Sequence, residues 1–277
     1  MIGAIAGDII GSVYEIAGNK SKRFKLFTDV NNFTDDTVLT VAVAEWLMTG
    51  ADLVDVFHEY FRLFPAVGYG GKYRQWAMSG NRDPYNSFGN GSAMRVSPVA
   101  WAFDTLEEVL EWARRSAEVT HNHPEGIKGA QAVAGALFIA RTGGSKEDII
   151  EFCMDEPIGY RVDRSVHLIR REHTMDVTCQ GSVPEAISCV LEAKDYEDAI
   201  RNAVSLGGDA DTQACIAGGI AEALWGVPEP IREKALGYLD GQLHAVVTEF
   251  TRQHIAGKPC RCAGEPAKIH TGTRELD

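Results

Sequence analysis

The chain has 277 residues, of which 45% are hydrophobic and 24% are charged, and its formal net charge is −12. This length permits one large domain or two small ones with a sizeable buried core. The acidic balance argues against a protein that binds nucleic acid through a general basic surface, although a nucleic-acid substrate held by a small basic patch is still open. Six scattered cysteines are typical of reduced core thiols and not of a disulfide framework.

The first 13 residues contain Asp8 and no lysine or arginine, and no apolar run approaches 18 residues. We therefore expect no secretion signal, no membrane span and a cytoplasmic location. Cys260 and Cys262 form a close cysteine pair. We interpret this pair as exposed and reduced, because a zinc site would need two further ligands that the sequence does not reveal.

Helical periodicity dominates the chain, and alternating strand-like segments are almost absent. Apolar residues recur at helical spacing in segments 2–13, 36–49, 51–63, 105–118, 126–141, 146–154, 183–193, 196–206, 212–225, 228–239 and 241–255. This pattern predicts an all-α fold, with a single compact multi-helix domain over residues 1–255 and a peripheral polar tail over 256–277. Between the helices, binding residues are expected in the glycine- and polar-rich loops at 14–33, 64–92 and 119–126.

Glycines form a stripe on the first predicted helix. Gly3, Gly7 and Gly11 recur every four residues and so lie on one face. Interior glycines cost about 0.5–1 kcal/mol each relative to alanine, which makes sense only if another backbone approaches closely. Segment 214–221 is similarly rich in small residues. We expect these two helices to be central neighbours that bring Asp8, Glu15 and residues 209–211 into one region.

Two acidic clusters each lead into a helical segment: Thr34-Asp35-Asp36-Thr37 and Gly207-Gly208-Asp209-Ala210-Asp211-Thr212. Like charges about 4 Å apart repel by about 1 kcal/mol in water and about 4 kcal/mol at an effective dielectric constant of about 20. If the clusters meet, hard divalent cations with oxygen ligands would neutralise them. The alternative for the first cluster is a helix cap in which Thr34 is the N-cap. The aspartates of the second cluster converge better if both lie on the loop that enters the helix.

Two further segments are candidates for ligand contacts. The turn at 88–95 has two glycines around Asn90, so its backbone N–H groups could face an anion, although a plain helix-start turn is the alternative. The glycine-rich segment at 68–71 is a weaker candidate of the same kind. His121 and His123 are two residues apart, yet the carboxylate-rich clusters favour a hard cation, so we prefer a substrate contact for His121. Glu15, at the end of the first helix, is a candidate general base or gate.

Taken together, these segments resemble the ADP-ribosylglycohydrolase family. The matching pieces appear in the family's order and cover about residues 1–240: they are 3–8 with 11–12 and 15, 33–37, 89–95, 120–121 and 207–212. The resemblance implies a compact all-α hydrolase with two divalent cations, Mg²⁺ or Mn²⁺, in a cleft. It further implies that the metal ligands are Thr34, Asp35, Asp36, Asp209, Asp211 and Thr212.

The same resemblance assigns catalytic roles to Glu15, Asp36 and Asp209, with Glu15 as a mobile acidic residue near the scissile bond. It places the ADP-ribose against Gly70, Ser87, Phe88, Gly89, Asn90, Gly91 and His121. The implied activity is hydrolysis of the glycosidic bond between ADP-ribose and an acceptor, which is a modified protein side chain or a small molecule. We expect a monomer. A non-catalytic ADP-ribose-binding or structural role and a metal phosphohydrolase are the alternatives, and the acceptor linkage (arginine, serine, acetyl ester or nucleobase) stays open.

Overall fold

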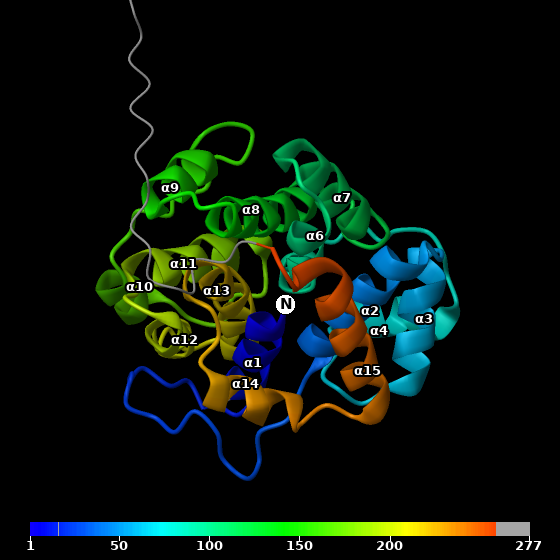
Figure 1. Ribbon diagram of the computed structural model, residues 1–277, viewed down its shortest axis with the longest axis horizontal. Coiled ribbons are helices and arrows are strands. Elements are labelled where there is room, and N and C mark those ends of the chain that lie inside the picture. Colours follow the sequence, from blue (N-terminus) through cyan, green and yellow to red (C-terminus); the bar gives the residue numbers. More distant parts are fainter. Residues whose placement is uncertain (16, 259–277) are drawn as a thin grey trace, which may run out of the picture.

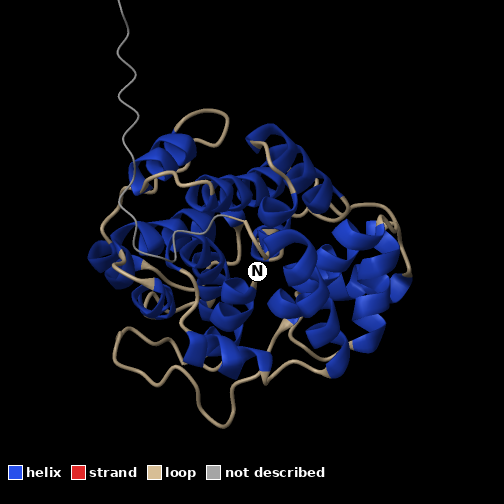
Figure 2. Cartoon of the chain, viewed as in Figure 1, coloured by secondary structure: helices blue, strands red, loops and turns tan. Residues whose placement is uncertain are grey.

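The structure is a computed structural model that describes residues 1–15 and 17–258. Helices make up the regular structure of these residues, which contain no strand (Figure 2). A single isolated bridge between Gly89 and Thr178 is their nearest approach to a sheet. The prediction of an all-α fold is confirmed. Within the described ranges, no helix has the length and apolarity that crossing a membrane would require.

Two helices from opposite ends of the chain, α1 (Ile2–Gly11) and α13 (Ala210–Trp225), lie side by side near the centre (Figure 1). The glycine stripe of α1 forms this contact. A Cβ atom placed on Gly7 would lie 2.5 Å from the carbonyl carbon of Ala214, and one on Gly11 would lie 2.5 Å from the Cα atom of Asp211. Only glycine permits so close an approach. The expected pairing of these two helices is therefore confirmed.

The other helices surround this pair. On one side lie α2 (Asp35–Thr49), α3 (Leu53–Leu63), α4 (Gly71–Ser79) and α15 (Gly241–Phe250), which continues as a π-helical turn at Thr251–Ile255. On the other lie α10 (Val166–Glu172), α11 (Cys179–Glu192) and α12 (Tyr196–Val204). Across the top of Figure 1 run α6 (Ser97–Ala102), α7 (Leu106–Glu118), α8 (Pro124–Arg141) and α9 (Lys146–Met154). Finally, α5 (Gly91–Met94) precedes α6, and α14 (Glu229–Leu236) follows α13.

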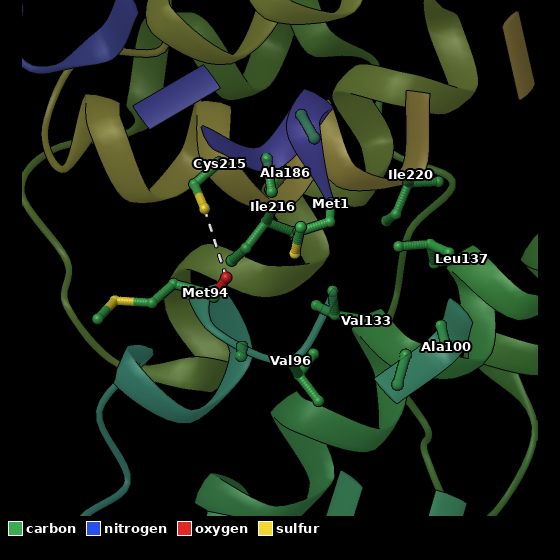
Figure 3. Packing of buried hydrophobic residues seen from close by; sticks show 14 of the residues in the cluster. Met1, Met94, Val96, Ala100, Val133, Leu137, Ala186, Cys215, Ile216 and Ile220 are labelled. Carbon is green, nitrogen blue, oxygen red and sulfur yellow. Dashed lines mark hydrogen bonds between the residues drawn. The ribbon is translucent and has the colours of Figure 1, made fainter. Parts of the chain in front are cut away.

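The core is continuous between α13 and the helices that carry the ligand-facing turns. Figure 3 shows Ile216 and Ile220 of α13 close to Val133 and Leu137 of α8. The thiol of Cys215 donates a hydrogen bond to the backbone oxygen of Met94, with 3.3 Å between sulfur and oxygen (Figure 3). This contact fixes the short helix α5 directly against the central pair.

The expectation of a loop throughout 64–92 was wrong for α4, and α6 and α10 were also not predicted. Tertiary packing explains α4, because its buried side chains are aromatic and join an aromatic cluster on α3. The ring centroids of Tyr73 and Phe57 are 6.2 Å apart, and those of Trp76 and His58 are 4.4 Å apart. A nine-residue helix beside three glycines has too little periodicity of its own to be recognised.

The proposed boundary between the domain at 1–255 and the tail at 256–277 falls at the edge of the described residues. Lys258 still contacts the body of the protein, since its Nζ atom lies 2.8 Å from the backbone oxygen of Trp101 and 2.8 Å from Oδ1 of Asp104. Residues 259–277, including Cys260 and Cys262, lie outside the described residues. The division into domain and tail therefore stays a prediction.

Candidate active site

The first acidic cluster begins α2. Thr34 is the N-cap residue, and its Oγ1 atom accepts a hydrogen bond from the backbone N–H of Asp36 at 3.3 Å. Asp35 and Asp36 occupy the first turn, where the helix dipole favours negative charge. The capping interpretation is thus correct, but it does not account for Asp36 fully. The Asp36 side chain is buried, and its Oδ1 atom has no hydrogen-bond partner among the described residues.

The second acidic cluster begins α13. Gly207 and Gly208 have φ angles of 73° and 72°, which side chains rarely adopt, and a Cβ atom on Gly208 would lie 2.8 Å from the backbone oxygen of Thr174. These glycines allow a sharp turn of the chain directly before Asp209, which is the N-cap of α13. The expectation that both aspartates lie on the loop was wrong for Asp211, which occupies the first helical turn.

The two clusters meet because α1 holds them together. Carboxylate oxygens of Asp8, Asp36 and Asp211 lie within 4.8 Å of one another, and so do those of Glu15, Asp209 and Asp211. The first group combines hard oxygen atoms from α1, α2 and α13, and the second combines Glu15, which follows α1, with two aspartates at the start of α13. The close approach of several carboxylates, which the sequence analysis considered, is therefore present in the folded chain.

Mutual repulsion and burial perturb these carboxyls strongly. Burial, followed by the charge of Asp8, raises the pKa of Asp35 to about 8. Burial and neighbouring carboxylates likewise raise the pKa of Asp36 and of Asp211 well above the usual range. The charged groups that raise these pKa values are other carboxylates, and none of the ion pairs among the described residues neutralises the cluster. A donor set of this kind, with a buried oxygen that has no partner, fits a divalent cation.

Asp8 was expected in the region of the second cluster, but the sequence assigned it no role in the site. It accepts hydrogen bonds from the backbone N–H of Thr34 at 3.0 Å, the hydroxyl of Thr34 at 2.7 Å and the backbone N–H of Thr37 at 3.1 Å, and also from the hydroxyl of Thr37. These bonds fix the start of α2 against α1. The sequence feature that indicates such a role is a lone acidic residue in an otherwise apolar helix. A charged side chain is buried only where hydrogen-bond or charge partners stabilise it.

The carboxylates form one wall of a cavity of about 380 Å³. All the predicted ligand residues line it, together with Glu15, Gly70, Ser87, Gly89, Asn90, Gly91 and His121. Of the described residues expected to border the ligand, Phe88 alone is off the cavity wall. Its ring is 41% exposed and lies 5.3 Å from the ring of His123. The cavity walls also include residues that were not predicted, among them Tyr85, Arg95 and Val177.

The turn at 88–91 supports the acidic cluster more than it binds an anion. The Nδ2 atom of Asn90 donates to Oδ2 of Asp209 at 2.6 Å and to Oγ of Ser182 at 3.1 Å. Two of the backbone N–H groups expected to face an anion already donate hydrogen bonds within the protein: that of Gly89 to Ser87 Oγ at 3.1 Å and that of Asn90 to the backbone oxygen of Val177 at 2.9 Å. The anion-binding expectation was wrong for these two groups.

The two histidines have separate roles. His123 is the N-cap of α8, and its Nδ1 atom accepts from the backbone N–H of Glu125 at 3.1 Å. His121 lines the cavity and is 5% exposed. Burial, followed by the charge of Arg95, lowers the pKa of His121 well below its usual value, so the imidazole is neutral. Their separation agrees with the preference for a substrate contact over a shared metal at His121.

Glu15 lies beside Asp209 and Asp211 of the acidic cluster, shortly after the end of α1. It is half-buried and lines the cavity. Burial, followed by the charge of Asp209, raises its pKa. A carboxyl group with a raised pKa can hold a proton and release it, which is what acid–base catalysis requires.

The fold and this cavity define an all-α protein whose candidate active centre is built from carboxylates. A family model described as ADP-ribosylglycohydrolase matches residues 1–259, and the chain belongs to this family. The resemblance noted from the sequence is thereby confirmed. The chain is accordingly an enzyme of the glycohydrolase class.

Curated relatives support the same conclusion. ADP-ribosylhydrolase ARH3 of Mus musculus is 28% identical over 338 aligned positions, which cover 90% of this chain and 91% of the mouse protein. ADP-ribosylarginine hydrolase Tri1 of Pseudomonas putida (strain GB-1) is 29% identical over 154 positions, which cover 53% of this chain and 41% of that protein. A solved structure titled ADP-ribosylglycohydrolase-related protein complex superposes with a TM-score of 0.63 at 23% identity, covering 91% of this chain and 96% of that one. This last similarity shows the fold alone.

Proposed function

We propose that this protein is a divalent-metal-dependent hydrolase that cleaves the glycosidic bond between ADP-ribose and an acceptor and releases ADP-ribose. One observation carries the proposal: carboxylates from both ends of the chain meet on one cavity wall, and the buried Asp36 Oδ1 has no partner there. The names of the relatives, which describe hydrolases of ADP-ribose linkages, support the substrate class.

We assign the metal ligands to the two acidic clusters and expect two ions, Mg²⁺ or Mn²⁺. The ligands would be Thr34, Asp35, Asp36, Asp209, Asp211 and Thr212, all of which line the cavity. A divalent cation held there supplies Lewis-acid chemistry, namely orientation of sugar hydroxyls and a lowered pKa for water. The chain contributes the geometry, because Asn90 holds Asp209 through its 2.6 Å hydrogen bond.

Glu15 is the residue that we assign to proton transfer. Cleavage at the anomeric carbon of ribose passes through an oxocarbenium-like state, in which the departing acceptor gains a proton and water loses one. Glu15 stands beside the acidic cluster without belonging to the proposed ligand set, and burial beside Asp209 raises its pKa, which favours a carboxyl group that can both hold and release a proton. Asp36 and Asp209 are assigned to catalysis through the ions that they hold.

The part of the cavity lining outside the carboxylate cluster is assigned to the ADP-ribose. Its lining includes Gly70, Ser87, Gly89, Asn90, Gly91 and His121. Phe88 is exposed and lies in sequence between the lining residues Ser87 and Gly89, where its ring would stack on a planar group that extends from the cavity. The acceptor would then leave on the side of Glu15.

The test is a panel of defined ADP-ribosyl linkages on arginine, serine, acetyl ester and nucleobase, each incubated with Mg²⁺ or Mn²⁺ and with excess EDTA. We expect release of free ADP-ribose from at least one linkage and loss of turnover in EDTA. Asp36→Asn should abolish turnover. Glu151→Gln, on the exposed side of the outer helix α9, is the matched control and should keep it.

Three results would overturn the proposal. Turnover that persists in EDTA contradicts the metal mechanism. AMP as the product indicates cleavage of the diphosphate and not of the glycosidic bond. Calorimetric binding of ADP-ribose without turnover of any linkage indicates a binding protein.

A further inference from the structure

Arg95 is a fully buried cation in the wall of the cavity. Its Nη2 atom donates to the backbone oxygen of Ser116 at 2.8 Å and to Oγ1 of Thr120 at 2.8 Å. Its guanidinium carbon lies 4.5 Å from the ring centroid of Phe57. None of the ion pairs among the described residues includes Arg95. A buried cation held without a carboxylate is costly, so its hydrogen bond to Thr120 calls for an explanation.

The protons of this cluster can be counted. A guanidinium N–H only donates, so Thr120 Oγ1 must accept from Arg95. The same Oγ1 atom lies 2.8 Å from Nδ1 of His121. A threonine hydroxyl carries one proton. If it donates that proton to Nδ1, then Nδ1 is unprotonated and the proton of the neutral imidazole sits on Nε2.

Tyr85 also interacts with the Thr120 hydroxyl, because a hydrogen bond from Thr120 acts to lower the pKa of Tyr85. Burial raises the pKa of Tyr85 to about 12, so the phenol keeps its own proton. A neutral imidazole nitrogen is a stronger acceptor than a phenol oxygen, and the bond from Arg95 makes the Thr120 hydroxyl a better donor. The Thr120 proton therefore goes to His121. A second proton on the imidazole is disfavoured, because the ring is buried beside Arg95.

The Nε2 atom of His121 faces the ligand side. A Cβ atom on Gly91 would lie 3.1 Å from Nε2, and one on Gly89 would lie 3.6 Å from it. His121 lines the cavity, and Nε2 is not among the buried side-chain atoms without a partner. This nitrogen is thus directed at the space where a ligand would lie, between two residues that have no side chain to cover it.

We propose that Arg95 and Thr120 are positioning residues that fix His121 as the Nε2–H tautomer, so that it presents a neutral hydrogen-bond donor to an acceptor oxygen of the bound substrate. The donor role rests on the proposed function, but the tautomer does not. An Nε2–H group cannot accept a proton from the cavity. His121 therefore recognises a hydroxyl or phosphate oxygen and takes no part in acid–base catalysis, which leaves proton transfer to Glu15.

The test is ¹⁵N NMR of the full-length chain with labelled histidine side chains, with the His121 signals assigned by comparison with His121→Gln. We expect a protonated Nε2 and an unprotonated Nδ1 at neutral pH. An Nδ1–H tautomer, an averaged pair of signals or an imidazolium at neutral pH would each overturn the proposal. This readout does not depend on turnover, so a failure of the proposed hydrolase activity leaves it intact and is recognised separately.

Variants test the chain of contacts. Thr120→Val removes the hydroxyl, so we expect a mixture of tautomers and an affinity for ADP-ribose that is lower by up to about tenfold in calorimetry. Thr120→Ser keeps the hydroxyl, so we expect it to have the single Nε2–H tautomer and the wild-type affinity for ADP-ribose. A purely structural role for the threonine methyl group would not explain that result. Tyr85→Phe should leave the Nε2–H signature unchanged. A change of tautomer in Tyr85→Phe, or the wild-type NMR signature in folded Thr120→Val, contradicts the proposed hydrogen bonds from Arg95 to Thr120 and from Thr120 to His121.

Discussion

Replacing Gly7 by alanine tests how the helix contact builds the acidic centre. The new Cβ atom would overlap the carbonyl oxygen of Ala214, and it would lie 2.5 Å from the carbonyl carbon and 2.9 Å from the backbone nitrogen of Cys215. Ordinary contact begins near 3.4 Å. The obstructing atoms are backbone, so no side chain can rotate away, and α1 and α13 must separate by about 1 Å.

The expected loss combines two opposing effects. Alanine favours an interior helix position over glycine by about 0.5–1 kcal/mol. Overpacking a rigid contact costs about 1–3 kcal/mol or more. We expect Gly7→Ala to lower the free energy of unfolding by about 2 kcal/mol and the melting temperature by several degrees. Because α1 carries Asp8 and leads to Glu15, the same shift should weaken Mg²⁺ binding.

Gly219→Ala is the matched control. Gly219 lies on α13 in the same core, but a Cβ atom there would meet only side chains, at 3.5 Å or more. This variant should be as stable as the wild type or more stable by up to about 1 kcal/mol. The free energy of unfolding of each variant is measured by urea denaturation monitored by circular dichroism. A Gly7→Ala protein within about 0.5 kcal/mol of the wild type, with unchanged Mg²⁺ affinity, would refute the reasoning.

Three further predictions concern the site and its support. Asn90→Ala removes the amide that holds Asp209; we expect kcat/KM to fall about 10–100-fold, and an unchanged value would show that Asp209 needs no such support. In EDTA, the folded state holds a proton on Asp35 up to a pKa of about 8, whereas an unfolded aspartate loses it near about 3.9. Stability of the metal-free protein should therefore fall as the pH rises between these values, and Mg²⁺ should reverse the loss; melting temperatures that do not change with pH in EDTA would contradict this. Trp76→Ala should cost about 3–5 kcal/mol because it empties the aromatic cluster beneath α4, while Met78→Ala on the exposed side of the same helix should stay within about 0.5 kcal/mol; equal unfolding curves for the two would disprove the anchoring role.

Residue spacing and helix-capping preferences were sufficient to predict the parts of the structure that depend on residues close together in the sequence. The spacing of Gly3, Gly7 and Gly11 predicts a close helix contact whatever the partner, and the small residues at 214–221 identify the partner by size. Thr34 before two aspartates predicts a helix start in any context. These features place most of the acidic centre before any coordinates are known.

Contacts between distant segments could not be predicted in the same way. Nothing in the sequence around Asn90 indicates that its amide reaches Asp209, or that Arg95 reaches Thr120 through the core. The helix α4 depends on rings contributed by α3, so its own segment appears as a loop. Each of these contacts forms only after the helices have packed.

The pairing of α1 with α13 also has a consequence for folding kinetics. The residues that meet at this contact, Gly7 and Ala214, are separated by most of the chain, so loop closure over that length must precede the contact. During synthesis, the first acidic cluster is made long before the second one, so the acidic centre cannot assemble until the second cluster has been synthesised. Any cation that binds only the assembled centre therefore stabilises the last step of folding by mass action, so the ion available to the cell would influence the yield of folded protein as well as its activity.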